Sequence, residues 1–232
     1  MNEHIAKQFD LDLENIRTRV LQMGGLVEQQ IVKAMQALAE GDLLLADQVI
    51  NNDQTVNRHE VELDEACAQV IARRQPTASD LRTVMMVVKT ITDLERIGDE
   101  AKKIAKMSKI IHVGEMPFVP PVPLSHVADI AVEMLRKALD AFARTDLATA
   151  AQVVRRDKDV DREFKSIMRQ LITFMMEDPR TISRSIELLF IAKSIERIGD
   201  HAKNVCEYVV YMAKGRDVRH IGLEGMEREV GG

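Results

Sequence analysis

A pentapeptide that occurs twice constrains the fold of this chain more than any other feature. The sequence ERIGD stands at residues 95–99 and again at residues 196–200, 101 positions later. Eight further matches precede the two copies at an offset of 104: Asp42, Leu43, Ala46, Gln48, Val49, Asp53, Val56 and Arg58 recur as Asp146, Leu147, Ala150, Gln152, Val153, Asp157, Val160 and Arg162. Similarity at a fixed period indicates one structural unit that is repeated. We therefore predict one helical unit written twice.

The prolines divide the chain into helices. All six prolines fall at three places, namely Pro76, the cluster within residues 117–123, and Pro179. Proline lacks the backbone N–H and its ring clashes with the preceding turn, so these places mark helix boundaries. Asp42 and Asp146 follow two further breaks and are predicted helix N-caps. The six predicted helices span 5–40, 42–74, 77–112, 124–144, 146–177 and 179–214.

Short connections predict that each set of three helices packs as an antiparallel bundle. The predicted fold is all-α, with two tandem three-helix bundles at residues 1–113 and 124–214, each with a core of its own. Residues 114–123 form a Pro-rich hinge between them. Residues 215–232 hold five of the eleven glycines and little apolar periodicity. This last segment is predicted to be a mobile tail.

Composition excludes several classes of function. The net charge is −5, aromatic residues make up 3% of the chain, and no basic stripe is interleaved with aromatic residues, which argues against nucleic-acid binding. No apolar run is long enough to span a bilayer, and the acidic N-terminus does not resemble a signal peptide, so we expect a cytoplasmic protein. Cys67 and Cys206 lack the spacing of metal ligands and are predicted to be two reduced thiols.

Acidic pairs flank the apolar seam of the third and sixth predicted helices. The seams consist of Leu94, Ile97, Ala101 and Ile104, and of Ile195, Ile198, Ala202 and Val205. At 100° per residue, Glu95 and Asp99 lie about 40° apart beside the first seam, and Glu196 and Asp200 repeat this arrangement. A glycine in the middle of a helix costs about 1 kcal/mol relative to alanine. The sequence keeps this glycine between the acids in both copies.

Two further carboxylates interrupt an apolar stripe in the fifth predicted helix. Asp157 and Asp161 lie among Val153, Val154, Phe164, Met168, Leu171 and Ile172, and their counterparts in the second helix are Asp53 and Asn57. Unpaired carboxylates on a packed face are costly, so something must compensate them. In antiparallel bundles the middle and last helices bring these side chains together, and we predict a metal site in each bundle. The predicted ligands are Asp53, Asn57, Glu95, Asp99, Asp157, Asp161, Glu196 and Asp200.

Oxygen ligands of this kind suit Mg, Mn, Ca or Fe. An alternative needs no metal, because Arg96, Lys102, Arg197 and Lys203 stand close enough in sequence to neutralise the acids. His201, beside Asp200, is expected to face solvent, since its counterpart in the first repeat is Glu100.

These residues carry a family resemblance. The doubled acidic motif, the six-helix count, and the opening Phe9-Asp10 to Glu14 followed by Met23-Gly24-Gly25-Leu26-Val27-Glu28 resemble the PhoU family over residues 3–214. The resemblance implies multinuclear iron or zinc clusters at Glu95/Asp99, Asp157/Asp161 and Glu196/Asp200. The fourth motif departs from the family pattern, because Asn57 follows Asp53. Asn keeps an oxygen ligand and loses a charge, which predicts a weaker or smaller site in the first bundle.

The resemblance also implies a regulatory function. PhoU proteins restrain phosphate uptake and the phosphate-starvation response by linking the ATPase of a Pst-type phosphate ABC transporter to a PhoR-type sensor kinase. On this basis we expect a homodimer that reaches the inner membrane only through these partners.

Two other classes of protein remain open. A carboxylate-bridged metal enzyme on a helical bundle would use Glu-x-x-His motifs, and none occurs in the sequence. The sequence also lacks a Gly-rich phosphate loop and a nucleophile elbow, so we predict a protein that is not an enzyme. The third possibility is a helical adaptor without metal.

Overall fold

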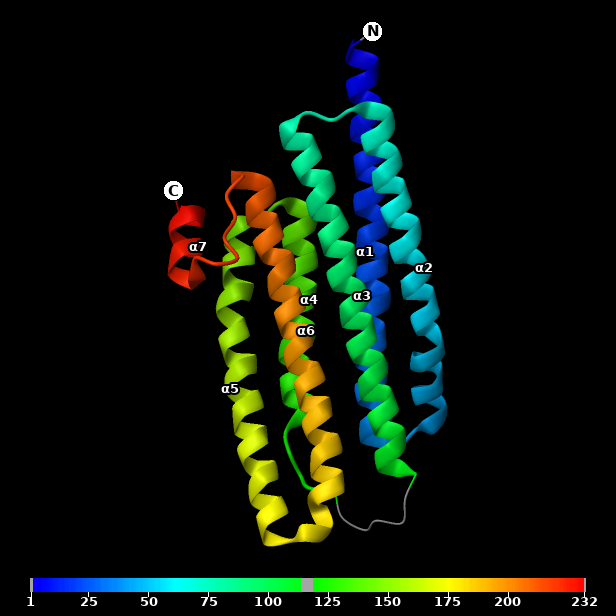
Figure 1. Cartoon of the computed structure of the whole chain (residues 1–232), viewed down its shortest axis with the longest axis vertical. Helices are drawn as coiled ribbons and strands as arrows, with labels where there is room; N and C mark the ends of the chain where they lie inside the picture. Colours follow the sequence, from blue (N-terminus) through cyan, green and yellow to red (C-terminus); the bar gives the residue numbers. More distant parts are fainter. Residues whose placement is uncertain (1, 114–118, 232) are drawn as a thin grey trace.

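Helices account for all the regular secondary structure in the computed structural model, which describes residues 2–113 and 119–231. Seven α-helices and one 3-10 turn follow one another along the chain (Figure 1): α1 (Asn2–Glu40), α2 (Leu43–Arg74), α3 (Ala78–His112), α4 (Leu124–Arg144), α5 (Leu147–Glu177), η1 (Pro179–Thr181), α6 (Ile182–Lys214) and α7 (Gly222–Gly231). None of the described helices is long and apolar enough to cross a membrane.

The helix ends follow the local signals in the sequence. The Asp42 carboxylate accepts hydrogen bonds from the backbone N–H groups of Leu44 and Leu45, both at 3.0 Å. Asp146 caps α5 in the same way, with the N–H groups of Ala148 and Thr149 at 3.0 and 3.1 Å. Each cap satisfies two N–H groups that have no partner inside the helix. The predicted N-caps are therefore confirmed, and the helices begin one residue after them.

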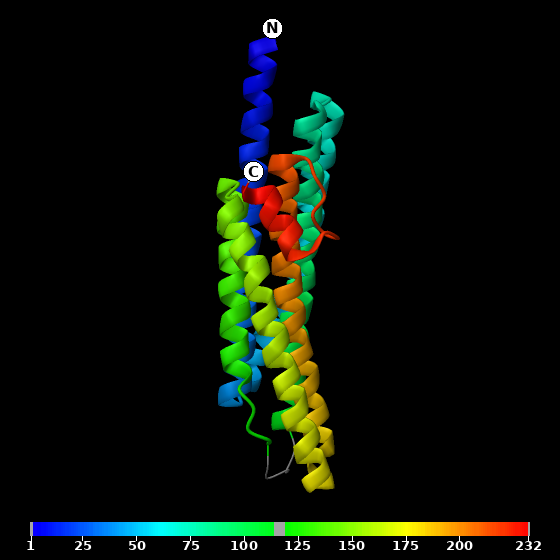
Figure 2. The ribbon, with the colours of Figure 1, turned by 90° about the vertical axis from the view of Figure 1, so that its left-hand side faces the viewer.

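Two antiparallel three-helix bundles lie side by side, α1–α3 and α4–α6 (Figure 1). The view turned by 90° shows an elongated body in which every long helix runs along the same axis (Figure 2). Helices α3 and α6 are adjacent at the centre and form the most extensive helix–helix contact among the described residues. The predicted all-α fold with two related bundles is confirmed.

The two bundles share one hydrophobic core, so the prediction of a separate core in each bundle is wrong. A single cluster of buried side chains runs through both halves, and includes Leu94 and Ile97 of α3 as well as Ile195 and Ile198 of α6. The physical reason is that α3 and α6 bury more than one face. Each packs on its own bundle and on the other central helix.

The end of the chain is helical where a mobile tail was expected. Gly215 ends α6 with a positive φ of 70°, and the chain then folds back so that α7 packs on α5. Met226 of α7 is buried, and Glu227 forms an ion pair with Arg155 of α5 at 3.0 Å. Apolar contacts of Met226 and Val230, together with this ion pair and a second one between Glu229 and Arg216 at 2.8 Å, thus hold a helix whose sequence has little apolar periodicity. Of the predicted hinge, residues 114–118 lie outside the described residues.

Candidate functional site

In the first bundle, α2 and α3 bring a buried carboxylate and a lysine together. Asp53 is 2% exposed, and its Oδ2 accepts a hydrogen bond from Lys102 Nζ at 2.5 Å. Lys102 Nζ also lies 3.9 Å from Oδ1 of Asp99. The buried Oδ1 of Asp53 has no hydrogen-bond partner within the described part of the chain. Asp53 therefore keeps one free oxygen inside the bundle.

The acids on this face repel one another. Burial raises the pKa of Glu95, and the charges of Asp99 and Asp53 raise it further. Burial and the charge of Glu95 likewise raise the pKa of Glu60. The structure thus gathers Asp53, Glu95 and Asp99 as predicted, and it adds Glu60, which lies about two turns after Asp53 on α2. Asn57 is exposed.

The second bundle repeats the arrangement with α5 and α6. Asp157 is buried, and its Oδ2 accepts a hydrogen bond from Lys203 Nζ at 2.8 Å. Burial raises the pKa of Asp157 above its usual range, and the neighbouring charges of Asp161 and Glu196 add to the effect. Burial, Glu196 and Asp157 raise the pKa of Asp200 in turn. All four predicted side chains of this bundle therefore share one electrostatic cluster.

The glycine between the acids permits close helix packing in one bundle more than in the other. A Cβ atom on Gly98 would lie 3.2 Å from Gln30 Oε1 and 3.3 Å from Val56 Cγ1. On Gly199 it would lie 3.5 Å from Val160 Cγ1, which is ordinary contact. Only at Gly98 would neighbouring side chains have to shift, by a few tenths of an ångström, to admit an added methyl group.

A lysine lies in each of the two predicted metal sites. Lys102 and Lys203 stand at equivalent positions of the repeat, and each donates to the buried aspartate of its acidic cluster. Among the described residues, no group of three or more His, Cys, Asp or Glu side chains is arranged to hold a metal ion. The oxygen donors and the free Oδ1 of Asp53 suit a hard cation, but with the lysines in place the side chains do not form a coordination shell. The structure shows that Lys102 and Lys203 pair with Asp53 and Asp157, which are contacts that the alternative without metal would use.

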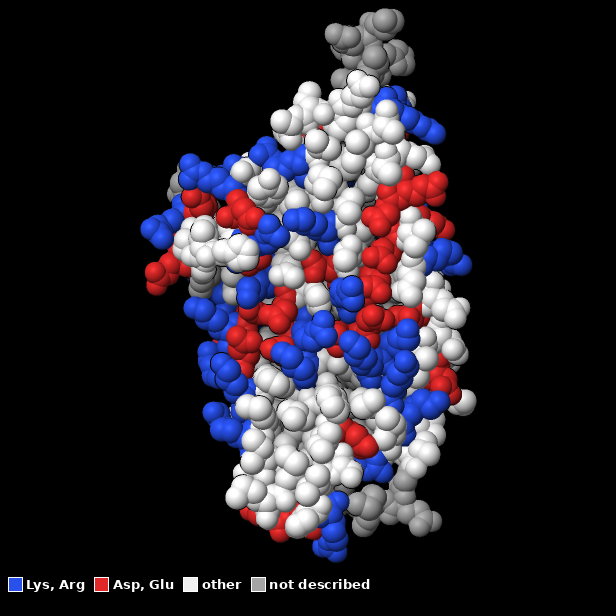
Figure 3. Space-filling view, viewed as in Figure 1, with Lys and Arg blue, Asp and Glu red and all other residues white. Residues whose placement is uncertain are grey.

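The two arginines of the repeated motif form ion pairs with acids in different places. Arg96 lies 3.7 Å from Glu95, whereas Arg197 pairs with Glu100 of the other bundle at 3.0 Å. Figure 3 shows basic and acidic side chains as a belt across the middle of this face, over α3 and α6, with largely uncharged surface below it. The belt therefore serves the contact between the bundles as well as the acidic clusters.

The expectation that His201 faces solvent is wrong. Its Nδ1 lies 2.6 Å from Oδ1 of Asp93 on α3, and Asn204 donates to the same oxygen at 3.1 Å. Asp93 is buried at the junction of the two bundles. Asp93 was not singled out in the sequence, because no repeat partner marks it. Lys102 and Lys203, in contrast, were already named from the sequence as residues that could neutralise the acids.

A cavity of about 440 Å³ opens between α3, α6 and the segment that follows α6. Arg82 lies over the ring of Tyr211 and Lys89 over that of Tyr208, at 5.9 and 5.7 Å from the ring centroids. Glu207 lines the same cavity, and burial raises the pKa of its carboxyl to about 7. The cavity therefore holds a carboxyl group that titrates near neutral pH.

The fold and the two clusters define a class of helical protein built from two copies of one acidic three-helix unit. The family model described as the PhoU domain matches residues 20–108 and 124–209, one match in each bundle. The chain belongs to the PhoU family.

Relatives match over nearly the whole chain. The phosphate-specific transport system accessory protein PhoU of Serratia marcescens is 52% identical over 98% of this chain and 93% of its own length. The protein of the same name from Escherichia coli (strain K12) is 48% identical over 100% of this chain and 96% of its own length.

Two crystal structures are similar in fold. That of PhoU from Pseudomonas aeruginosa covers 90% of this chain and 100% of its own, with a TM-score of 0.85 and 46% identity. That of the phosphate transport system regulatory protein PhoU from Streptococcus pneumoniae covers 90% of this chain and 99% of its own, with a TM-score of 0.84 and 30% identity. The relatives thus carry accessory and regulatory names.

Proposed function

We propose that this chain is the regulatory accessory protein of a Pst-type phosphate ABC transporter, and that it restrains phosphate uptake and the phosphate-starvation response. In this role it links the transporter ATPase to a PhoR-type sensor kinase. The observation that carries the proposal is the match of both bundles, over nearly full length, to proteins named as accessory to the phosphate-specific transport system.

The shape of the molecule supports a linking role. Long helices aligned along one axis around a single core give a stiff body with two ends (Figure 2). Two partners can each bury the roughly 1,200 to 2,000 Å² of a specific interface on such a body without overlapping. The chain acts in the cytoplasm at the inner face of the membrane through these partners, and it pairs as a homodimer.

The acidic clusters are the proposed cation sites of this regulator. Asp53, Glu95 and Asp99 would hold metal in the first bundle, and exposed Asn57 leaves that site smaller. Asp157, Asp161, Glu196 and Asp200 would hold it in the second. When bound, iron or zinc, or else Mg, Mn or Ca, supplies positive charge that ties carboxylates of two helices together. Lys102 and Lys203 must first leave the carboxylates that they now neutralise, so a metal-free adaptor with lysine in place is the second candidate for the same role.

A deletion strain tests the regulatory proposal. Loss of the chain is expected to leave phosphate-starvation genes switched on in phosphate-rich medium, and the wild-type chain supplied in trans is expected to switch them off again. Pull-downs at near-physiological salt should capture the transporter ATPase and the sensor kinase. Normal repression in the deletion strain together with no capture of either partner overturns the proposal. Dioxygen consumption by metal-loaded protein would then favour a metal enzyme.

A further inference from the structure

Five basic side chains form a stripe along the outer side of α5. They are Arg155, Lys158, Arg162, Lys165 and Arg169, all of them exposed, and together they are the α5 stripe. At 100° and 1.5 Å per residue they lie within about 80° of one another over a length of about 21 Å. Figure 3 shows Lys and Arg side chains along the left edge of the molecule, over α5. A chain with a net charge of −5 thus gathers positive charge on one edge.

Most of this charge is not neutralised within the molecule. Arg155 pairs with Glu227 and Arg162 with Asp159. Lys158, Lys165 and Arg169 have no acidic partner within the described residues. The acids of this stretch of α5, at positions 157, 159, 161 and 163, fall outside the 80° sector of the stripe. The positive charge is therefore free to meet an anionic surface.

Apolar side chains continue the stripe toward the turn between α5 and α6. Met176 is 81% exposed and lies in the same sector of the helix, and Ile172 is exposed beside it. Ile182, Ile186 and Phe190 of α6 are exposed at the same end of the α5–α6 hairpin. Figure 3 shows this lower part of the face as largely uncharged. Contiguous exposed apolar surface marks a site that meets a protein or a membrane.

We infer that the α5 stripe docks the chain directly on anionic lipid headgroups, with Met176 and Ile172 entering the headgroup region. A straight row of Lys and Arg on a convex helix complements a flat, negatively charged surface. Protein interfaces are depleted of lysine and rely on buried aromatic or arginine anchors. The stripe holds two lysines and no aromatic residue, and two of its three arginines are already engaged in ion pairs within the chain. A basic face joined to exposed apolar side chains is typical of helices that lie in the membrane interface.

Direct lipid docking goes beyond the proposed function, in which only the partners hold the chain at the membrane. The stripe would bind lipid whether or not the chain regulates phosphate uptake, so the two proposals fail independently.

Flotation of the full chain with vesicles tests the docking. Wild-type protein is expected to bind vesicles of phosphatidylcholine and phosphatidylglycerol in equal amounts, and not vesicles of phosphatidylcholine alone. Binding should weaken as salt is raised, since ions screen exposed charges. The triple variant Lys158→Glu, Lys165→Glu, Arg169→Glu should bind up to about 100-fold more weakly, because each of the three cations near an anionic surface contributes roughly fivefold.

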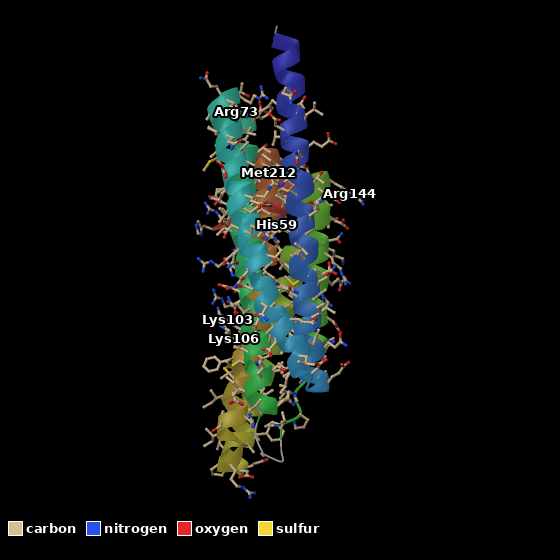
Figure 4. All side chains as sticks on the ribbon, turned by 90° about the vertical axis from the view of Figure 1, so that its right-hand side faces the viewer. His59, Arg73, Lys103, Lys106, Arg144 and Met212 are labelled. Carbon is tan, nitrogen blue, oxygen red and sulfur yellow. The ribbon has the colours of Figure 1, made fainter. Side chains whose placement is uncertain are left out.

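A matched control changes the same charge elsewhere. Arg58, Arg73 and Lys106 are exposed on α2 and α3. Figure 4, which looks at the opposite edge of the molecule, labels Arg73 and Lys106 there. Their triple reversal to Glu changes the net charge by the same amount and should leave vesicle binding within about twofold of wild type, because they lie off the stripe.

A second variant tests the apolar part without altering charge. Ile172→Ser with Met176→Ser should lose the binding that persists at high salt. The inference is overturned if wild type does not bind the anionic vesicles, if the two triple variants lose binding equally, or if the stripe variant keeps vesicle binding while losing a protein partner. Far-UV circular dichroism and thermal unfolding of every variant exclude loss of the fold as the cause.

Discussion

Lys102 and Lys203 are the two residues on which the charge balance of the acidic clusters depends. Each donates to a buried aspartate across a helix pair, at 2.5 and 2.8 Å. Removing one partner of a buried ion pair leaves an uncompensated charge, which costs more than the pair itself contributes. If the acidic clusters bind cations as proposed, the lysine and an external cation would compete for the same carboxylates.

Replacement of Lys102 tests this competition. Lys102→Met should lower the free energy of unfolding at neutral pH by about 2 kcal/mol, because Asp53 loses its hydrogen-bond donor. Added Mn²⁺ should restore part of the loss, since a ligand that binds only the folded state stabilises it. Urea unfolding with and without Mn²⁺ measures both effects.

Lys103→Met is the matched control. Its partner Glu100 also pairs with Arg197, so the buried charge keeps a counterion. A smaller loss and no effect of Mn²⁺ are expected. Equal losses in the two variants would contradict the role assigned to Lys102.

Glu207 makes stability depend on pH. Burial raises its pKa from 4.5 to about 7. Between these values the folded protein keeps a proton that the unfolded chain has released, so the free energy of unfolding falls as the pH rises through this interval. For a single site the full effect is about 3 kcal/mol.

Glu207→Gln removes this titration. The variant should unfold at higher urea concentration than wild type at pH 8, with a gain of up to about 2 kcal/mol, and should lose that advantage at pH 5. Urea unfolding at the two pH values gives the comparison. A gain of the same size at both pH values would show that the effect is one of packing.

At the scale of helices, the two motif glycines look alike in sequence and differ in packing. Alanine is favoured over glycine inside a helix by about 1 kcal/mol. At Gly199 the added methyl group meets ordinary contacts, whereas at Gly98 it presses on Gln30 and Val56. The sequence repeat alone does not reveal this difference.

Gly199→Ala is expected to stabilise the protein by up to about 1 kcal/mol, because helix propensity acts without a clash. Gly98→Ala should be neutral or destabilising by about 1 kcal/mol, because Gln30 and Val56 must move. Thermal unfolding of the two variants side by side measures the difference. A larger gain at Gly98 than at Gly199 would contradict the close approach of α3 to α1 and α2.

Helix ends could be predicted from the sequence because their causes are local. Proline geometry and the caps at Asp42 and Asp146 act within a few residues. The gathering of Asp157 with Glu196 and Asp200 was also predictable, since it needs only helix periodicity and antiparallel packing. The contact of His201 with Asp93 was not, because it joins helices of different bundles. Helix α7 was not predictable either, because it packs on α5, which is distant in the sequence.

At the scale of the whole molecule, the contact between α3 and α6 makes the two bundles one structure. Buried apolar residues continue from one bundle into the other, and Asp93 with His201 adds a polar contact at the junction. An isolated bundle would expose this apolar face to water, which favours association or loss of structure. Each sequence repeat thus forms one three-helix bundle, but the two bundles are stable only when they are packed together.

Cutting the chain between the bundles tests this cooperativity. The full chain should unfold in a single transition, as expected for one core. Residues 1–113 and residues 119–232, expressed separately, should each associate or lose cooperative unfolding, because the α3 or α6 face is uncovered. Mixing the two should restore a one-to-one complex with the transition of the intact chain. Light scattering with thermal circular dichroism measures these states, and a monomeric 1–113 fragment that unfolds cooperatively would show that the first bundle has a sufficient core of its own.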